Sequence, residues 1–359
     1  MDNYFFRKDL LNKRINIIEV EDKKINLSLN ESPYNPFSFF SKDDWEDFLN
    51  FNINRYPRKD IEEKLKSEIC EYNLNKIKPD NILMGNGIDD LLYLLFISIS
   101  DKNSKILVSV PSYPDYINYS LSCGVGNISI NLKENFQLDI DEIIENGKKK
   151  DVKMIIFCTP NNPTGNLLKK SDIFYILENI HDKLVVIDEA YFEFSGETFI
   201  NNIYNYENLI ILRSFSKGFF SSGLRFGYLI ANSFIIGELL KVKSVFNLSA
   251  LTQFVALKLF MKKDIIKKYI NVLIEERDFL FKELGKIEGI TSYKSYTNFL
   301  LFRVSENFNH IDLYNYLLKK EISLRNVSSL PMLDNCLRVS IGTKEQNKIF
   351  LSEMKKYFG

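Results

Sequence analysis

Short apolar runs alternate with helix-like stretches from about residue 80 to residue 245, and this order restricts the possible folds more than any other feature of the sequence. Two of the runs, residues 153–157 and 184–187, are apolar at nearly every position, as is typical of strands that helices cover on both faces. The expected strands are residues 82–84, 106–110, 154–158, 184–187, 209–212 and 226–230. We therefore predict an α/β fold with a mostly parallel sheet sandwiched by helices, and a ligand site beyond the carboxyl ends of its strands.

The pattern changes after residue 241. Long helices are expected at residues 251–261 and 265–284, followed by strands at residues 299–304, 322–324 and 337–341. The segment before residue 40 is polar and irregular, so we expect it to cross the domains as an arm. A chain of 359 residues is long enough for one large and one smaller domain. The predicted division is an arm at residues 1–40 that joins the small domain, a large domain at 41–245, and a small α+β domain at 246–359.

The composition excludes several classes of function. Lysine plus arginine (47) equals aspartate plus glutamate (47), so the chain lacks the net basic charge that attracts nucleic acid or an anionic membrane. The four cysteines are scattered without a Cys-x-x-Cys pair, which favours a reducing, cytoplasmic location. The longest apolar run, residues 91–99, is too short to span a bilayer, and the first residues do not resemble a leader peptide, so we expect a soluble, unprocessed protein. With two histidines and no histidine or cysteine cluster, we expect neither a metal site nor a histidine-based triad.

Three polar clusters follow the expected strands in the second half of the sheet. They are residues 160–165 (PNNPTG), 188–191 (DEAY), and 213–217 (RSFSK) continued by 223–228 (GLRFGY). Taken alone, the first is a common turn sequence, and a lysine in a Ser/Gly-rich loop is more commonly a solvated surface charge. Asp188, however, ends an apolar strand, where a carboxylate is costly to desolvate unless a cation meets it. Together, the clusters indicate one site at one edge of the sheet.

With these motifs the chain resembles the class I/II aminotransferases of fold type I, and most closely the histidinol-phosphate aminotransferase group. The resemblance runs from residues 29–34 (LNESPY) to residues 337–343 (LRVSIGT), which is nearly the whole chain. It implies an enzyme whose large domain binds pyridoxal 5'-phosphate. Lys217, in the Ser-x-x-Lys motif that begins at Ser214, matches the lysine that holds the cofactor as a Schiff base and moves the proton.

The resemblance also assigns the cofactor's other contacts. Asp188 matches the acid that keeps the pyridine nitrogen protonated, Tyr191 and Asn162 match the residues that hydrogen-bond its 3-oxygen, and Tyr113 matches the aromatic residue that stacks on the ring. For the cofactor phosphate, the resemblance implies backbone amides from a Gly-rich turn before the helical run at residues 91–99, a serine hydroxyl and an arginine guanidinium. These groups belong to Gly87, Ile88, Asp89, Ser214 and Arg225. The Asp89 carboxylate would repel a phosphate, so we expect it to cap that helix.

Tyr56, in residues 54–57 (NRYP), matches the tyrosine that reaches the cofactor phosphate of the neighbouring subunit. The resemblance therefore implies a homodimer whose active sites each need both chains.

Two arginines, Arg325 and Arg338, match the residues that grip a substrate phosphate or carboxylate, and Asn30 and Tyr34 of the arm are expected to close over the same group. The implied reaction exchanges an amino group between glutamate and a small phosphorylated ketone. Imidazole-acetol phosphate is the substrate of the resembled group, and dihydroxyacetone phosphate shares its phosphate-CH2-C=O half. Residues 218–222 (GFFSS) replace the usual Ala-Phe-Gly-Leu-Ala, and the Tyr/Pro-Gly segment usual before residue 27 is missing. Another keto-phosphate therefore stays open as the substrate.

The main alternative is decarboxylation of threonine phosphate or serine phosphate, because such decarboxylases share the scaffold and the lysine. A cofactor-binding transcriptional regulator would need an added DNA-binding module, and an inactive scaffold would be expected to lack Lys217 or Asp188. An acyl-transferring synthase of the same fold is disfavoured by the two arginines and by residues 160–165.

Overall fold

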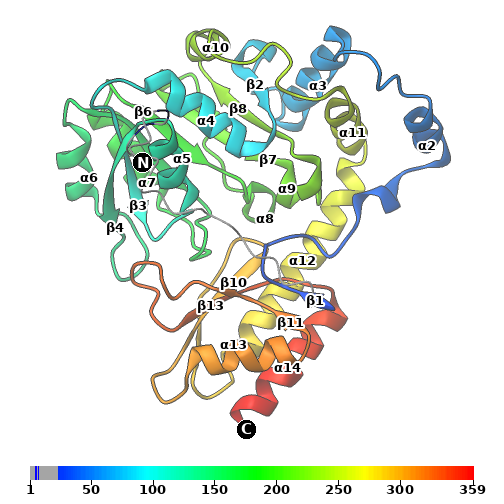
Figure 1. The fold of residues 1–359 in the computed structure, drawn as a ribbon, viewed down its shortest axis with the longest axis vertical. Helices are drawn as coiled ribbons and strands as arrows, with labels where there is room; N and C mark the ends of the chain where they lie inside the picture. Colours follow the sequence, from blue (N-terminus) through cyan, green and yellow to red (C-terminus); the bar gives the residue numbers. More distant parts are fainter. Residues whose placement is uncertain (1–4, 6, 8–22) are drawn as a thin grey trace.

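The computed structural model describes residues 5, 7 and 23–359. The first part of the predicted arm, and the chain start on which the leader-peptide prediction rests, lie outside the described residues. The predicted α/β fold with a mostly parallel sheet is confirmed (Figure 1). Its seven strands are β2 (Ile82–Gly85), β3 (Lys105–Val110), β4 (Gly126–Asn131), β5 (Val152–Cys158), β6 (Leu184–Asp188), β7 (Leu209–Ser214) and β8 (Gly227–Ala231), in the order β2-β8-β7-β6-β5-β3-β4. Strand β8 is antiparallel to both of its neighbours, and the other pairs are parallel.

The strands form where they do because both faces of the sheet are covered. In β5, Ile155 and Phe157 enter one hydrophobic core, whereas Met154, Ile156 and Cys158 enter the core on the opposite face. One core includes residues of α4 (Gly87–Ile99), α5 (Asp115–Ser122) and α10 (Ser233–Leu240). The other includes residues of α3 (Lys59–Tyr72), α6 (Ile140–Gly147), α7 (Lys170–Asn179), α8 (Phe192–Ser195), α9 (Phe215–Gly218) and α11 (Ala250–Phe260). Continuous apolar runs are therefore the correct signature of this sheet.

The C-terminal part carries a second, antiparallel sheet in the order β12-β13-β10-β9, below the large sheet in Figure 1. Its strands are β9 (Ile290–Ser292), β10 (Phe299–Val304), β12 (Arg325–Asn326) and β13 (Cys336–Ser340), and its helices are α12 (Lys263–Leu284), α13 (His310–Lys319) and α14 (Lys344–Phe358). The long helix α12 extends from the neighbourhood of α11, beside the large sheet, down to the second sheet (Figure 1). The expected strands and long helices lie within two residues of those observed.

The described part of the arm is tied to the C-terminal sheet region. Strand β1 (Ile25–Asn26) pairs in parallel with β11 (Ile322–Ser323), and the chain then passes through a short 3-10 helix (Pro36–Phe39) to α2 (Lys42–Leu49). Further 3-10 helices are Pro79–Asn81, Ile200–Asn202 and Ser222–Leu224. No helix in the described part of the chain is both long and apolar enough to cross a membrane.

Candidate active site

A cavity of about 610 Å³ lies at the carboxyl ends of the large sheet's strands, within the range of small-molecule sites. Strand ends of the large sheet, the arm and the β12–β13 region all contribute to its wall. Twelve of the predicted site residues line it: Asn30, Ile88, Asp89, Tyr113, Asn162, Asp188, Tyr191, Ser214, Lys217, Arg225, Arg325 and Arg338. The fold thus brings together side chains that are up to 308 positions apart (338 − 30).

Lys217 lies in the single-turn helix α9 that follows β7, and its side chain reaches into the cavity. Its Nζ donates a hydrogen bond to the Leu29 carbonyl oxygen at 2.9 Å. Burial, followed by the nearby Arg338 guanidinium, lowers the pKa of Lys217 from 10.5 to about 8. Near neutral pH a much larger fraction of this amine is therefore unprotonated and nucleophilic than for a surface lysine.

Asp188 ends β6 and is 4% exposed. Its Oδ2 accepts a hydrogen bond from the Tyr116 hydroxyl at 2.5 Å, and its Oδ1 accepts one from the Ala190 N–H at 2.9 Å. Burial raises the pKa of this carboxyl to about 6. Within the described residues it forms no ion pair with Lys, Arg or His, so a cationic ring N–H in the cavity fits the unmet charge.

The sequence analysis did not predict Tyr116. It lies in α5, three positions after Tyr113, and the two rings meet edge to face with centroids 5.3 Å apart. Tyr113 precedes the helix, and the Tyr116 N–H donates to the Tyr113 carbonyl oxygen at 3.3 Å, so a turn brings the two rings together.

The N-terminus of α4 contributes Ile88 and Asp89 to the wall of the cavity. Gly87 has a φ of +82°, and a Cβ there would lie 2.7 Å from Nη2 of Arg225, so this position requires glycine. Arg225 is itself left-handed, with a φ of +55°, and its Nη1 lies 3.4 Å from Ser216 Oγ. Helix-terminal amides, a guanidinium and serine hydroxyls can bind a phosphate here.

The predicted capping role of Asp89 is wrong. The N-cap residue of α4 is Asn86, and its N–H donates to the Asp90 carboxylate at 2.9 Å. Asp89 lies at the third helical position, where its side chain faces the cavity. It accepts a hydrogen bond from Arg225 Nη2 at 2.8 Å, and burial raises its pKa. The Asp89 side chain turns to the cavity instead of capping α4 because Arg225 supplies there the cation that a partly buried carboxylate needs.

Arg338, from β13, contacts the loop after β5 and the arm. Its Nη1 donates to Asn162 Oδ1 at 2.6 Å and its Nη2 to the Ser28 carbonyl oxygen at 2.8 Å, whereas its buried Nε has no hydrogen-bond partner among the described residues. Burial lowers the pKa of Arg338 to about 10. Asn30 joins the same wall, since its Nδ2 donates to the Tyr191 hydroxyl at 3.0 Å.

Three predicted residues do not line the cavity. Gly87 lies behind it against Arg225, as described above. The Tyr34 ring packs on Phe220 and Tyr269, with centroids 6.0 and 4.6 Å away. Tyr56 is 74% exposed and stacks on Phe246 at 4.4 Å, so within one chain it points away from the site.

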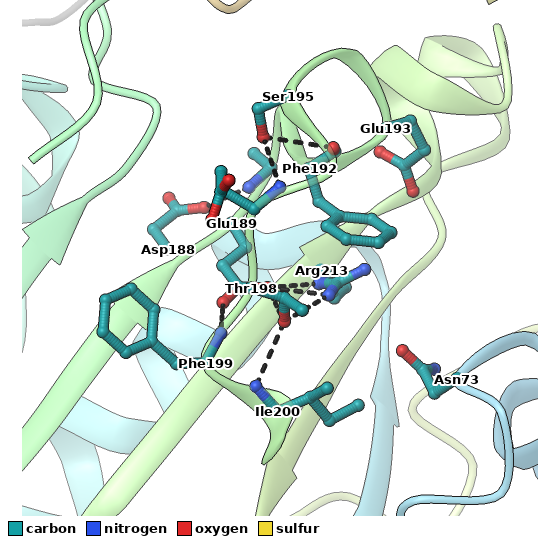
Figure 2. Close-up of polar contacts among 12 residues, drawn as sticks. Asn73, Asp188, Glu189, Phe192, Glu193, Ser195, Thr198, Phe199, Ile200 and Arg213 are labelled. Atoms are coloured by element: carbon teal, nitrogen blue, oxygen red, sulfur yellow. Dashed lines mark hydrogen bonds and ion pairs between the residues drawn. The ribbon is translucent and has the colours of Figure 1, made fainter. Parts of the chain in front are cut away.

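A buried ion pair behind the site was also missed by sequence analysis (Figure 2). Glu189 follows Asp188, Arg213 precedes Ser214, and their side chains are 0% and 1% exposed. Nη2 of Arg213 lies 2.7 Å from Oε2 of Glu189. Charged residues at the ends of two apolar strands were the available signal.

The donor set fits pyridoxal phosphate. An acid that is buried without a cationic partner among the described residues, a partly neutral lysine amine, and a helix N-terminus beside a guanidinium correspond to the ring nitrogen, the aldehyde and the phosphate of that molecule.

Comparison with known proteins agrees with this chemistry. A profile of the family "Aminotransferase class I and II" matches residues 22–354. The chain is 36% identical over 334 residues to the histidinol-phosphate aminotransferase of Thermoanaerobacter sp. (strain X514), covering 93% of each protein. The crystal structure of the histidinol-phosphate aminotransferase from Clostridium acetobutylicum matches with a TM-score of 0.83 and 31% identity, covering 93% of this chain and 98% of the other.

A second solved structure shows the same fold at lower identity. It is the histidinol-phosphate aminotransferase from Sinorhizobium meliloti in complex with pyridoxal-5'-phosphate, with a TM-score of 0.85 and 17% identity over 99% of this chain and 98% of the other. The family match covers most of the chain and includes the cavity residues. The chain therefore belongs to the class I and II aminotransferases and is a pyridoxal-phosphate-dependent enzyme of that family.

Proposed function

We propose that this aminotransferase exchanges an amino group between glutamate and a small phosphorylated ketone. The observation that carries the substrate class is the pairing of Arg325 and Arg338, which lie opposite each other in the β12–β13 register and both line the cavity. Within the described residues neither guanidinium forms an ion pair with an acid. Two neighbouring cations repel each other, and Arg325 contributes to the lowered pKa of Arg338, so a multiply charged anion such as a phosphate suits them.

Imidazole-acetol phosphate is the first candidate ketone, because the relatives at 35–37% identity are histidinol-phosphate aminotransferases. Dihydroxyacetone phosphate carries the same phosphate-CH2-C=O half and is the second candidate.

Bound pyridoxal phosphate supplies a conjugated ring that accepts the electron pair left when a bond to the substrate α-carbon breaks. The Lys217 amine is assigned to hold the cofactor and, once displaced by the substrate, to carry the proton to and from that carbon. The Asp188 carboxylate is assigned to face the ring nitrogen and keep it protonated. Tyr191 and Asn162 are assigned to the cofactor's 3-oxygen, and the Tyr113 ring is assigned to stack on the pyridine, since all three line the cavity.

We assign the cofactor phosphate to Arg225, Ser214 and the N-terminal amides of α4 at Gly87, Ile88 and Asp89. The Asp89–Arg225 ion pair must then share its guanidinium with the phosphate. Arg325, Arg338 and Asn30 are assigned to the substrate, with Tyr34 reaching it when the arm closes.

We also propose that the functional unit is a homodimer in which Tyr56 serves the partner's site. Its exposure and its stacking on Phe246, itself 54% exposed, support a contact surface there. The domain division proposed is an arm at residues 1–40, a large domain at 41–245 and a small domain at 246–359, since each of the last two carries its own sheet. A cytoplasmic location is proposed because no disulfide joins the four cysteines, all of which lie in the described part.

The test is to incubate the enzyme with glutamate and each keto-phosphate and to measure 2-oxoglutarate. We expect 2-oxoglutarate to form in step with the phosphorylated amine. Release of carbon dioxide from threonine phosphate or serine phosphate, without any keto product, would instead identify a decarboxylase. Arg325→Gln should raise KM for the keto-phosphate by roughly tenfold or more and KM for glutamate much less, because a guanidinium–phosphate contact is charge-assisted.

A further inference from the structure

Tyr116 touches two groups that the proposed mechanism needs. Its side chain is 0% exposed, and its hydroxyl donates to Asp188 Oδ2 at 2.5 Å. Its ring meets Tyr113 edge to face, at a centroid distance of 5.3 Å and an interplanar angle of 83°. It therefore links the acid assigned to the ring nitrogen with the ring assigned to stack on the pyridine, although it does not line the cavity itself.

The Asp188 carboxylate depends on its donors because it is nearly excluded from water. Only two hydrogen bonds to it are present among the described residues, from the Tyr116 hydroxyl and from the Ala190 N–H. Burial raises the pKa of Asp188, and the bond from Tyr116 is the largest opposing influence. A hydrogen bond to the charged form of a buried acid favours that form.

The other titratable groups around Asp188 cannot replace this donor. They are Cys158 on β5, Asp89 on α4, and Glu189 and Tyr191 beside it in the chain. The two acids raise the pKa of Asp188, and the Tyr191 hydroxyl lies with Asn30 instead. Burial, followed by the charge of Asp188, raises the pKa of Tyr116 well above its usual value, so Tyr116 stays protonated and remains a donor.

We propose that Tyr116 is a positioning residue that orients Asp188 and holds it in the ionised form required to bind the protonated pyridine nitrogen of the cofactor. This inference rests on the assignment of Asp188 in the proposed function. The ring of Tyr116 also packs edge to face against the ring of Tyr113. One side chain therefore holds in position both the Asp188 carboxylate and the Tyr113 ring assigned to stack on the cofactor.

The test compares Tyr116→Phe with Tyr316→Phe. The Tyr316 hydroxyl, on α13, donates to the Glu353 carboxylate at 2.8 Å, and neither residue lines the cavity, so loss of this tyrosine–carboxylate bond is a matched control. The dissociation constant of the apo-protein for pyridoxal phosphate is measured by fluorescence titration between pH 5 and pH 9, with thermal unfolding to verify folding. We expect Tyr116→Phe to weaken binding by about tenfold, the usual effect of one hydrogen bond to a charged group. We also expect its pH profile to move to higher pH, because Asp188 becomes harder to ionise, whereas Tyr316→Phe should match the parent protein.

Two further variants separate the possible failures. Asp188→Asn should weaken binding and remove the pH-dependent step near pH 6, whereas the step near pH 8 that belongs to Lys217 should remain. If binding is unchanged and the step near pH 6 persists, the assigned role of Asp188 is wrong. If Asp188→Asn behaves as expected but Tyr116→Phe keeps the parent's affinity and pH profile, the role of Tyr116 is wrong. An equal loss of affinity in Tyr116→Phe and Tyr316→Phe, without a shift of the pH profile, would mean that Tyr116 has no role specific to Asp188. If Tyr116→Phe does not fold, Tyr116→His keeps a ring N–H donor, and it must bind pyridoxal phosphate more tightly than Tyr116→Leu, which has no donor, for the inference to stand.

Discussion

Arg213 and Glu189 form a buried ion pair immediately behind the active site, with Nη2 of Arg213 2.7 Å from Oε2 of Glu189. Figure 2 shows the neighbouring residues that contact the pair. Glu189 also accepts hydrogen bonds from the Phe199 N–H at 2.7 Å and from the Thr198 hydroxyl at 2.9 Å, and the Arg213 guanidinium lies 3.4 Å from the centre of the Phe192 ring. The pair therefore joins the ends of β6 and β7, from which the residues assigned to the cofactor extend.

Glu189→Gln is predicted to reduce the free energy of unfolding by about 3–5 kcal/mol, because it leaves the Arg213 charge buried without its counter-ion. Urea unfolding of the apo-protein measures this. Asp151→Asn is the control, since Asp151 pairs with Lys105 at the partly exposed surface and its loss should change stability little. Equal effects of the two substitutions would contradict the structural role of the buried pair.

The reactivity of Lys217 is predicted to depend on pH in a specific window. An amine with a pKa of about 8 is half neutral at about pH 8 and gains most of its neutral form between about pH 7 and pH 9. The rate at which the apo-protein captures pyridoxal phosphate, followed by visible absorbance, should therefore rise through about pH 8 and level off above about pH 9.

Arg338→Gln should move this profile to higher pH, because the Arg338 guanidinium helps to lower the pKa of Lys217. Arg58→Gln, which removes a surface arginine paired with Asp60, should leave it unchanged. A parent profile that keeps rising to pH 10 would show that the amine is not perturbed.

Mixed dimers test whether Tyr56 acts across the subunit interface. Lys217→Ala and Tyr56→Phe are each predicted to be impaired, the first completely. After mixing and reassembly, each hybrid dimer should contain one site with both Lys217 and the partner's Tyr56 intact, so activity should rise clearly above the sum of the two variants. No recovery, in hybrids verified by mass spectrometry, would mean that Tyr56 does not serve the partner's site.

Arg338→Lys is predicted to raise KM for glutamate by roughly 10- to 100-fold although the positive charge is kept. A lysine cannot make the two-pronged contact of a guanidinium, and the bonds to Asn162 and to the Ser28 carbonyl would also be lost. Steady-state kinetics with varied glutamate measures this. An unchanged KM would place the substrate carboxylate elsewhere.

The sequence was sufficient for six of the seven strands of the large sheet, because burial on both faces produces continuous apolar runs. It failed at β4, an edge strand whose sequence, GNISIN, alternates and is mostly partly exposed or exposed. The cavity residues from β5, β6 and β7 were predictable because parallel strands end at one edge, and the family resemblance supplied the arm and the C-terminal arginines.

What could not be predicted depends on side-chain direction in three dimensions. Asp89 was expected to cap α4, but its carboxylate accepts a hydrogen bond from Arg225 instead. Arg225 is 136 positions away in sequence, so the sequence alone did not indicate this contact. Tyr116 and the Arg213–Glu189 pair were missed for the same reason, since their partners come from other elements of the sheet.

The most direct test of the account is to reduce the purified holoenzyme with sodium borohydride, which fixes the cofactor to the amine that holds it, and to map the labelled peptide by mass spectrometry. The account predicts the phosphopyridoxyl mass on Lys217 and its loss in Lys217→Ala. A label on any other residue, or no label in protein that has been supplied with pyridoxal phosphate, would contradict it.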